Sequence, residues 1–577
     1  METMGKVATA IVALVILRWG WKLLNWIWLK PKKLEKWLRS EGYKGNSYKF
    51  LMGDMIELAT IVKEGKSKPI PVTHDITSYA LPFDHHIISK YGEKSFIWLG
   101  PNPRMYIRDP ELIKEILLRP NEFRKPHPEP FRDSIIRGLL VTEGHKWTKH
   151  RKIINPAFNL QNLTMMFSAI SLSCSEMIHK WELLTAGSGP TEVDVWPYID
   201  NLAGDVISRT AFGSSYEEGQ KIFRIQKEQI NLLFQMLFIL HLPGRRFIPT
   251  QANKKFKENV KELRNVLMGI INKRKKAIDM GEGKQDDLLG ILLASNTKEI
   301  EEHGVGMRQK IFRIQKEQID LIFQMVFILH LPGRRFIPTQ ANKKFNENIK
   351  ELRSVLMGII NKRKRAVKIG EDKHEDLLGI LLESNKKEIE EHGVGMSMDD
   401  VIEECKLFYI AGSETTSNLI VWTMVCLSLH QEWQMQAREE IVKVFGNKEL
   451  DFEGLKNLKI LTMILHEVLR LYPPAVMITR ATHKDTKLGN MTIPPGVFAN
   501  GIVNATKGKG SSPFIPFSSG PRVCLGQNLA MTKAKTAIAM VLQRFSFELS
   551  PSYKHSPFQV FTVPPQFGAH LILHNLS

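Results

Sequence analysis

The chain has 577 residues, of which 43% are hydrophobic and 24% charged, a composition typical of a globular protein with a large core. Its four cysteines, Cys174, Cys405, Cys426 and Cys524, show no paired spacing, which excludes a disulfide framework and a zinc site of the CxxC type. A net charge of +20 could indicate a nucleic-acid partner, but the basic residues are interspersed with 60 acidic ones and form no nucleic-acid-binding motif. The charge favours instead a basic face for membrane headgroups and for an acidic protein partner.

The first segment is apolar and predicts a membrane anchor over residues 1–30. Residues 7–29 are long enough to span a bilayer, although Arg18 and Lys22 interrupt the apolar run. No small-residue cleavage site follows, so an uncleaved anchor is favoured over a signal peptide. Basic residues just beyond it place the remainder, residues 31–577, in the cytosol as one large domain. These basic residues are Lys30, Lys32, Lys33, Lys36 and Arg39, and we expect Pro31 between them to form a stiff exit from the membrane.

Two pairs of residues are spaced so that each pair shares one face of a predicted helix. Trp147 and Arg151 are four positions apart, and Glu467 and Arg470 are three apart. An exposed acid–base pair at this spacing contributes only a few tenths of a kcal/mol to a helix. Either pair alone is commonplace, so both gain weight only from the motifs around them.

The middle of the chain contains a duplication. Residues 220–307 recur almost unchanged as residues 309–396, and most differences exchange similar side chains. Solenoid repeats have shorter periods and occur at least three times, so we interpret this pair as one segmental duplication of three helical stretches. If one copy takes its place in the fold, the other must loop out, exchange with a neighbouring molecule or prevent folding.

A long apolar helix is predicted over residues 397–429, after the capping-box pattern Ser397-x-x-Asp400. Glycine costs a helix about 1 kcal/mol relative to alanine, so a glycine at position 412 calls for a reason. Room beside the helix for an oxygen ligand is one reason, since neighbouring acid and hydroxyl groups can order water and deliver protons to bound dioxygen. A solvated helix face is the alternative for such a triplet in isolation. The candidate catalytic residues are Ala411, Gly412, Glu414 and Thr415.

Residues 517–526 hold Cys524 in a glycine-bracketed turn, directly before a helix-like run over residues 527–543. The N–H groups of a tight turn, a helix N-terminus and the nearby Arg522 all favour a thiolate over a thiol. A single thiolate presented in this way suits an axial iron ligand. A buried structural cysteine before a helix is the alternative.

These motifs resemble one known family. Residues 517–526 read Phe-x-x-Gly-x-Arg-x-Cys-x-Gly and resemble the cysteine loop of the cytochrome P450 family, the haem-thiolate monooxygenases. Residues 411–416 resemble the motif of the family's helix I, and the pairs at 467/470 and 147/151 resemble those of its helices K and C. Residues 30–35, 403–409 and 543–553 are similar to the plant clan-72 branch, the secologanin-synthase-like enzymes.

The resemblance implies a cytochrome P450 fold, mainly α with a small β region, as a single large catalytic domain behind the anchor. It implies haem b as cofactor, with Cys524 as the iron ligand, and Glu414 and Thr415 in proton delivery. It also implies a buried Glu467–Arg470 pair that locks the cysteine loop through a third residue. The implied cofactor-binding residues are Trp147, Arg151, Arg480 and Arg522 at the propionates, with Phe517 beside the thiolate and Gly526 in its loop.

The same resemblance implies a location and partners. It predicts an endoplasmic reticulum protein whose catalytic domain faces the cytosol and receives electrons from an NADPH-dependent flavoprotein reductase. The predicted substrate is a hydrophobic, terpenoid-like small molecule, and no nucleic acid is expected.

Two departures from the family pattern favour an alternative. The duplicated stretches resemble the helices over the substrate channel, and at the 499/500 junction sheet strands, a short helix and a Pro-Glu-Arg-Phe motif are missing. The arginine of that motif would be the third member of the Glu467–Arg470 network, and breaking such a buried network costs about 3–5 kcal/mol. The alternative is therefore a catalytically inactive or mis-assembled gene product of the same family.

Overall fold

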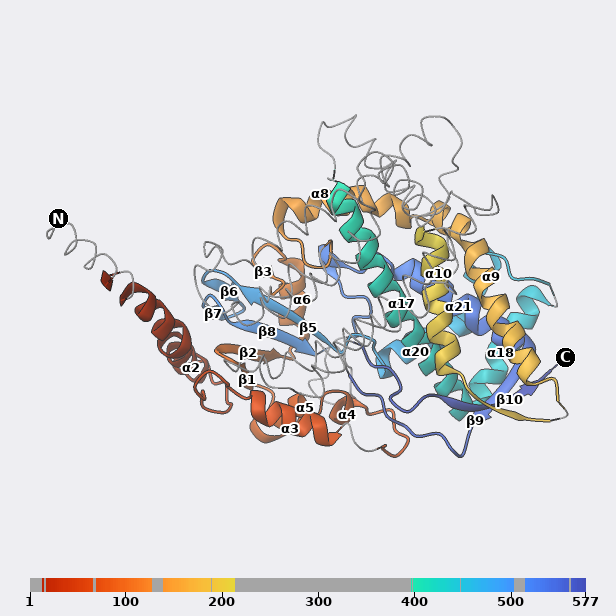
Figure 1. Ribbon diagram of the computed structural model, residues 1–577, viewed down its shortest axis with the longest axis horizontal. Helices are drawn as coiled ribbons and strands as arrows, with labels where there is room; N and C mark the ends of the chain where they lie inside the picture. Colours follow the sequence, from red (N-terminus) through yellow and green to blue (C-terminus); the bar gives the residue numbers. More distant parts are fainter. Residues whose placement is uncertain are drawn as a thin grey trace, which may run out of the picture.

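A computed structural model describes residues 13–14, 17–65, 69–126, 138–187, 189–212, 396, 398–446, 448–502, 514–559 and 562–576. Apart from Met396, the duplicated segments lie outside the described residues. The prediction about their placement concerns these segments and therefore stays a prediction. Figure 1 shows a small region of sheet at one side of the molecule and a larger group of packed helices at the other. This arrangement agrees with the expected fold class, mainly α with a small β region.

The helices with the longest runs are α2 (Lys30–Ser40), α3 (Met55–Gly65), α5 (Pro82–Tyr91), α8 (Gly144–Ile154), α9 (Leu160–Leu184), α10 (Trp196–Phe212), α17 (Met398–Leu429), α18 (Gln431–Phe445), α20 (Lys459–Leu471) and α21 (Gln527–Arg544). Shorter helical turns are η1 (Asn25–Leu29), α4 (Thr77–Ala80), α6 (Pro110–Leu118), η2 (Asn155–Phe158), α19 (Gly454–Asn457) and η5 (Gly520–Arg522). The strands are β1 (Phe96–Leu99), β2 (Asn102–Ile107), β3 (Phe123–Arg124), β4 (Thr191–Asp194), β5 (Met477–Thr482), β6 (Thr486–Leu488), β7 (Met491–Ile493), β8 (Phe498–Ile502), β9 (Phe545–Leu549) and β10 (His570–Asn575).

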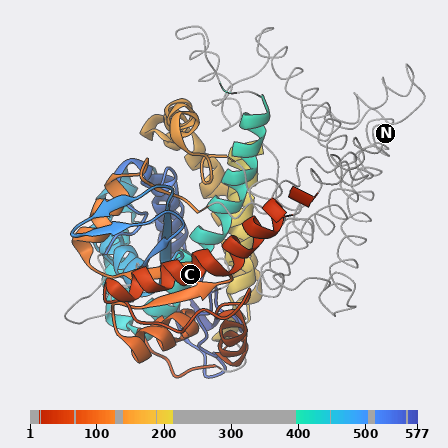
Figure 2. The same ribbon diagram turned by 90° about the vertical axis from the view of Figure 1, so that its left-hand side faces the viewer.

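The helical core is built around α17. Its second half, residues 419–427, is buried on every side, as expected for a helix that other helices surround. Figures 1 and 2 both show α10 lying alongside it. Side chains of α9, α10, α17 and α21 belong to one hydrophobic cluster, in which Trp181 and Trp422 are among the largest buried residues. The helix that carries the candidate catalytic residues is thus held rigidly in the core.

The larger sheet has the strand order β1-β2-β8-β5-β3. Strand β8 pairs in parallel with β2 and antiparallel with β5, with Ala499 opposite Met105 on one side and Arg480 on the other. β8 therefore crosses the 499/500 junction, where the sequence predicted missing strands. The residues on both sides of the junction form one extended strand, and the missing family segment stays a prediction. A three-stranded sheet, β4-β10-β9, and the hairpin β6-β7 complete the β structure.

The N-terminal helix continues through Pro31 rather than ending there. Residues 17–29 are helical and lead directly into α2. Residues 25–29 form a π-helical turn before Pro31, in which the N–H of Lys30 donates to the carbonyl of Asn25, and Pro31 itself has no N–H to donate. The hydroxyl of Tyr48 donates to the carbonyl of Ile27 in this turn, over 2.6 Å. The prediction of a stiff connection holds, but the stiffness comes from a continuous helix.

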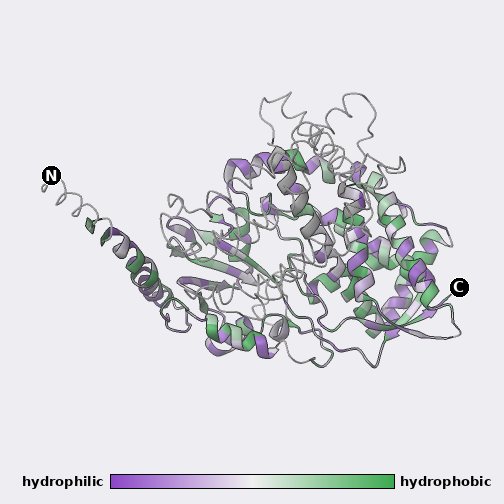
Figure 3. Cartoon of the chain, in the orientation of Figure 1, coloured by the Kyte–Doolittle hydropathy of each residue, from purple (hydrophilic) through white to green (hydrophobic). Residues whose placement is uncertain are grey.

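Among the residues that the structure describes, no helix is long and apolar enough to cross a membrane. Much of the predicted anchor, residues 1–12, 15 and 16, lies outside them. Figure 3 shows hydrophobic residues along the projecting N-terminal helix. Its exposed apolar side chains are Leu14, Leu17, Trp19, Trp21, Leu24, Trp28 and Leu29.

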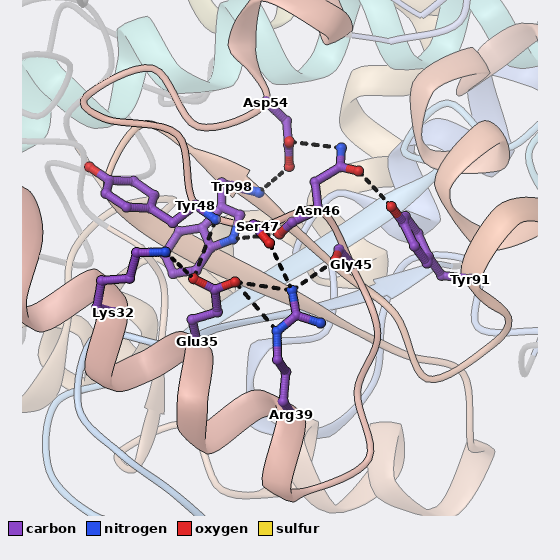
Figure 4. A network of polar contacts seen from close by, with 10 residues as sticks. All are labelled: Lys32, Glu35, Arg39, Gly45, Asn46, Ser47, Tyr48, Asp54, Tyr91 and Trp98. Carbon is purple, nitrogen blue, oxygen red and sulfur yellow. Dashed lines mark hydrogen bonds and ion pairs between the residues drawn. The ribbon is translucent and has the colours of Figure 1, made fainter.

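A network of polar contacts fastens α2 to the sheet (Figure 4). The carboxylate of Glu35 accepts from Arg39 Nη2 at 3.0 Å and from Lys32 Nζ at 2.9 Å. Elsewhere in the network, Asp54 accepts from Nδ2 of Asn46 at 2.9 Å and from the backbone N–H of Trp98 on β1 at 2.7 Å. The start of the large domain is therefore fixed to the sheet by groups that a hydrophobic pattern does not reveal.

Candidate haem-binding site

The loop before α21 is shaped by three residues with positive φ: Phe517 (64°), Ser518 (65°) and Gly520 (71°). A Cβ at position 520 would lie 2.6 Å from the carbonyl oxygen of Leu117, so only glycine fits there. The turn closes where the N–H of Cys524 donates to the carbonyl of Phe517 at 2.8 Å. The sequence correctly placed Cys524 in a tight turn just before a helix, and the carbonyl of Phe517 has a part in that turn.

Cys524 is exposed although its surroundings are largely protein. Burial raises the pKa of its thiol, while the N–H of Gly526 and the charges of Arg151 and Lys125 act to lower it. The N–H donor and the cations therefore act in the predicted direction, toward the thiolate, and desolvation opposes them. A metal ion held by Cys524 would supply further stabilisation, since a coordinating thiol is deprotonated outright.

Four cationic side chains from separate parts of the chain meet near Cys524. Arg151 on α8 donates from Nη1 to the carbonyl of Val523 at 2.9 Å, and the guanidinium of Arg522 lies 4.5 Å from the ring centre of Trp147. Burial lowers the pKa of Arg480, on β5, to about 10, and the charge of Arg522 adds to this shift. Each of these predicted residues therefore lies at the same site.

The fourth cation, Lys125, was not predicted, and neither was the acid beside it, Glu143. Burial and the charges of Arg480 and Arg522 lower the pKa of Lys125 to about 7. Glu143 forms an ion pair with Arg522 at 2.6 Å and accepts from the backbone N–H of Lys125 at 3.1 Å. No sequence signal distinguishes Lys125 from the other lysines and arginines. Its role arises because the fold brings the end of β3 close to the cysteine loop.

This donor set fits a haem. Four cations face the thiol and one acid, Glu143, so the described residues leave positive charge that two propionates would balance. Nη1 of Arg522 is buried and has no partner among the described residues, and no described acid forms an ion pair with Arg480. A Cβ at Gly526 would meet nothing within 4 Å, which leaves space beside the loop that carries Cys524. Planar guanidinium groups bind carboxylates in a bidentate way, as a propionate requires.

The candidate catalytic residues occupy the middle of α17. The hydroxyl of Thr415 donates to the carbonyl of Ala411 at 2.6 Å, and the side chain of Ala411 is exposed although the helix is otherwise in the core. Glu414 is half-buried one position before Thr415. The acid and the hydroxyl thus lie beside the exposed Ala411, in a partly buried stretch of the described part of this helix.

Gly412 has a different role from the one predicted. A Cβ at this position would lie 2.5 Å from Cδ1 of Ile207 on α10. The glycine therefore allows α10 and α17 to pack closely, and its missing side chain does not point into a space for an oxygen ligand.

The pair Glu467–Arg470 forms on α20 as its spacing predicted. Nη2 of Arg470 lies 2.5 Å from Oε1 of Glu467, and Nε donates to Oε2 at 2.8 Å. The implied burial is wrong, because the Glu467 side chain is 55% exposed. An exposed ion pair contributes at most about 1 kcal/mol, less than the buried pair that the resemblance implied.

Comparison with known proteins identifies relatives along the whole chain. The sequence model described as Cytochrome P450 matches residues 81–311, 303–500 and 498–569. The match breaks near residues 303–311 and again at 498–500, the two places where the sequence shows the duplication and predicts a missing segment.

Among curated proteins, the chain is 42% identical to Cytochrome P450 CYP72A219 of Panax ginseng over 607 residues, with 100% of each chain covered. It is 40% identical to Cytochrome P450 72A15 of Arabidopsis thaliana and 39% identical to Secologanin synthase 1 of Catharanthus roseus, each over 100% of this chain and 99% of the relative. The first alignment is longer than the 577-residue chain, so that relative has residues without a counterpart here.

Proposed function

The chain belongs to the cytochrome P450 family, and on this premise we propose that it hydroxylates a terpenoid-like small molecule at a membrane surface. Family membership makes it an oxidoreductase of the monooxygenase type, with haem held through a cysteine thiolate. The observation that carries the proposal is the meeting of Cys524 with four cations, of which Arg480 is buried. A haem, with its iron and two carboxylates, matches one thiolate beside such a cluster.

The side chains at this site have separate tasks. Cys524 would hold the iron, and Arg151, Arg480, Arg522 and Lys125 would bind the propionates, with Trp147 stacked on Arg522. Haem, when bound, supplies the activation of dioxygen and the insertion of one oxygen atom into a C–H bond. The hydroxyl of Thr415 and the carboxyl of Glu414 would hold and relay protons at the open side of α17.

The substrate class rests on the relatives. One of them is named Secologanin synthase 1, and the chain shares 39% identity with it over nearly all of both sequences. This similarity supports a hydrophobic, terpenoid-like substrate, because members of the clan-72 branch act on such compounds.

The proposed membrane location rests on the N-terminal helix. Its exposed leucines and tryptophans alternate with Arg18 and Lys22 and are followed by basic residues from Lys30 onward. Tryptophan and lysine are the residues that anchor helices at a membrane interface. We place the catalytic domain on the cytosolic face of the endoplasmic reticulum, where a flavoprotein reductase would dock on the basic surface.

The alternative, an inactive gene product, is not favoured by the full-length similarity. The two features that still support this alternative are the duplication and the exposure of the Glu467–Arg470 pair.

A carbon-monoxide difference spectrum of the reduced chain in membranes tests the proposal. We expect a strongly red-shifted Soret band from the exact 577-residue chain, and loss of that band in Cys524→His, which offers a neutral ligand. A control substitution, Cys426→Ser, removes a buried thiol of the core rather than the loop cysteine. An absent band in the unmodified chain, or a band unchanged in Cys524→His, would overturn the proposed function.

A further inference from the structure

Lys533 is a buried lysine that the reaction outlined above does not use. It lies in the middle of α21, and its residue is only 3% exposed. Lysine is almost never fully buried without a charged partner. Among the residues that the structure describes, no carboxylate forms an ion pair with Lys533. Its Nζ donates instead to the carbonyl oxygen of Gly412 on α17, at 3.2 Å.

The surroundings of Lys533 bring its pKa close to neutral pH. Burial lowers the pKa of Lys533 to about 7. The group that faces it from α9 is the thiol of Cys174, whose own pKa burial raises to about 12. Asp205 on α10 also acts on Cys174, but this carboxylate is already paired with Arg209 at 2.6 Å. Gly412 on α17 offers only its carbonyl.

The acceptor of Lys533 belongs to an unusual stretch of helix. Four successive carbonyls, those of residues 411–414, each accept a hydrogen bond from a side chain. Thr415 donates to Ala411, and Ser417 donates to Ser413 at 3.2 Å and to Glu414 at 3.0 Å. Side-chain donors of this kind bend helices, because they compete with the backbone N–H groups. Lys533 is the donor in this stretch that comes from another helix.

We propose that Lys533 is a positioning residue, whose hydrogen bond to the carbonyl of Gly412 fixes the backbone that carries Glu414 and Thr415. The consequence for catalysis rests on the proposed function. Gly412 is constrained at two points. The side chain of Ile207 occupies the space that a Cβ would need, and Nζ of Lys533 donates to the carbonyl. A neutral amine has two N–H donors, so this one acceptor leaves one of them without a partner. An ammonium group carries three donors, so protonation leaves two without a partner and draws the group toward other acceptors.

Hydrogen exchange of the amides in residues 412–418 tests this inference without any need for activity. We expect Lys533→Met to exchange about three- to tenfold faster than the unmodified chain, since one hydrogen bond to the helix is lost. Lys533→Gln keeps a donor and should restore protection. After correction for the intrinsic effect of pH on amide exchange, protection of residues 412–418 in the unmodified chain should change around pH 7. Both variants should show no such change.

The chain offers a matched control two residues away. Lys535 lies on the same helix and donates to a backbone carbonyl, that of Leu455, at 3.1 Å. Lys535→Met should leave exchange in residues 412–418 unchanged. Lys533→Met should fold, because methionine is an apolar residue of similar length and the buried amine disfavours the folded state below its unperturbed pKa. Equal exchange in Lys533→Met and the unmodified chain, or no rescue by Lys533→Gln, would overturn the proposal.

A second measurement separates this inference from the proposed function. The ratio of hydrogen peroxide released to NADPH consumed, with the flavoprotein reductase present, should rise in Lys533→Met and return in Lys533→Gln. If the unmodified chain shows no red-shifted carbon-monoxide band, the proposed function fails while the exchange result still decides the role of Lys533 in the helix. A normal band with an unchanged peroxide ratio would overturn the catalytic part of the inference alone.

Discussion

Nδ1 of His150 lies 2.8 Å from Oε1 of Glu404, and the two side chains are 2% and 0% exposed. The pair joins α8, which carries Trp147 and Arg151, to the first half of α17. The other oxygen of Glu404 accepts from the backbone N–H of Leu139 at 2.8 Å. The helix at the propionates and the helix with Thr415 are therefore tied together by a buried ionic contact.

Breaking this contact should be costly. His150→Phe leaves the carboxylate of Glu404 buried without its cation, and we expect a loss of about 3–5 kcal/mol in the free energy of unfolding. The double variant His150→Phe/Glu404→Gln should recover part of this loss, because glutamine can still accept from Leu139. Lys146→Ala is the control, since Lys146 pairs with Asp400 at the surface and should cost at most about 1 kcal/mol. Urea unfolding of the four proteins measures the differences, and a double variant no more stable than His150→Phe would contradict the coupling.

The same pair predicts a dependence on pH. Burial lowers the pKa of His150, but its contacts with Asp400 and Glu404 outweigh burial and raise the pKa above the usual 6.5. The stabilisation is therefore complete below pH 6.5 and is lost as the pH rises through the raised value. The unfolding midpoint should fall over this window in the unmodified chain and stay level in His150→Phe. A parallel decline in both proteins would assign the effect to other groups.

His555 predicts the opposite behaviour in acid. It is 1% exposed, and burial lowers its pKa to about 4. Nδ1 contacts the hydroxyl of Tyr553 at 2.8 Å, and Nε2 contacts the carbonyl of Thr73 at 3.1 Å, an arrangement that suits a neutral imidazole. Its stabilisation is present above pH 6.5 and is lost as the pH falls toward 4, about 3 kcal/mol in all. In His555→Gln the free energy of unfolding should fall less steeply between pH 6.5 and 4. An unchanged slope would show that His555 does not cause the loss of stability in acid.

Arg480 should affect haem binding and stability in opposite directions. Arg480→Met removes a buried charge that no described acid pairs, so the haem-free chain should be no less stable than before. Haem should bind about 10- to 100-fold more weakly, because a hydrogen bond to a charged group is worth about 1.5–3 kcal/mol. Haem transfer to an acceptor protein measures the affinity, and Arg124→Ala, exposed on the neighbouring β3, is the control. A variant that loses stability and haem together would indicate a structural role for Arg480.

The sequence predicted local features well and long-range ones poorly. The helix expected over residues 397–429 is α17 at Met398–Leu429, and Trp147 and Arg151 do share one face, because both features depend on periodicity along the chain. Lys125, Glu143 and the contact between His150 and Glu404 could not be predicted, since each depends on which segments the fold brings together. The packing role of Gly412 was not predicted for the same reason, because the residue that it packs against, Ile207, belongs to α10.

Gly412→Ala should destabilise the chain despite the better helix propensity of alanine. The gain of about 1 kcal/mol is smaller than the cost of about 1–3 kcal/mol for overpacking against Cδ1 of Ile207. Ile207→Val removes that methyl group, so the double variant should be more stable than Gly412→Ala alone. Thermal unfolding of the three variants measures this coupling. If Gly412→Ala is as stable as the unmodified chain, α10 does not limit the space at this position.

Tyr48→Phe should loosen the N-terminal helix without disturbing the haem site. The variant removes the side-chain donor to the carbonyl of Ile27, in the turn before Pro31, and an unsatisfied buried carbonyl costs about 1–3 kcal/mol. The ring of Tyr48 stays in place against Trp98, with ring centres 4.9 Å apart, so packing is preserved. Hydrogen exchange should therefore rise in residues 25–31 while the carbon-monoxide spectrum stays the same. The double variant Tyr48→Phe/Pro31→Ala restores a backbone donor to Ile27 and should return the exchange to its original rate. Failure of that rescue would show that the helix is held at Pro31 by the aromatic contacts rather than by this hydrogen bond.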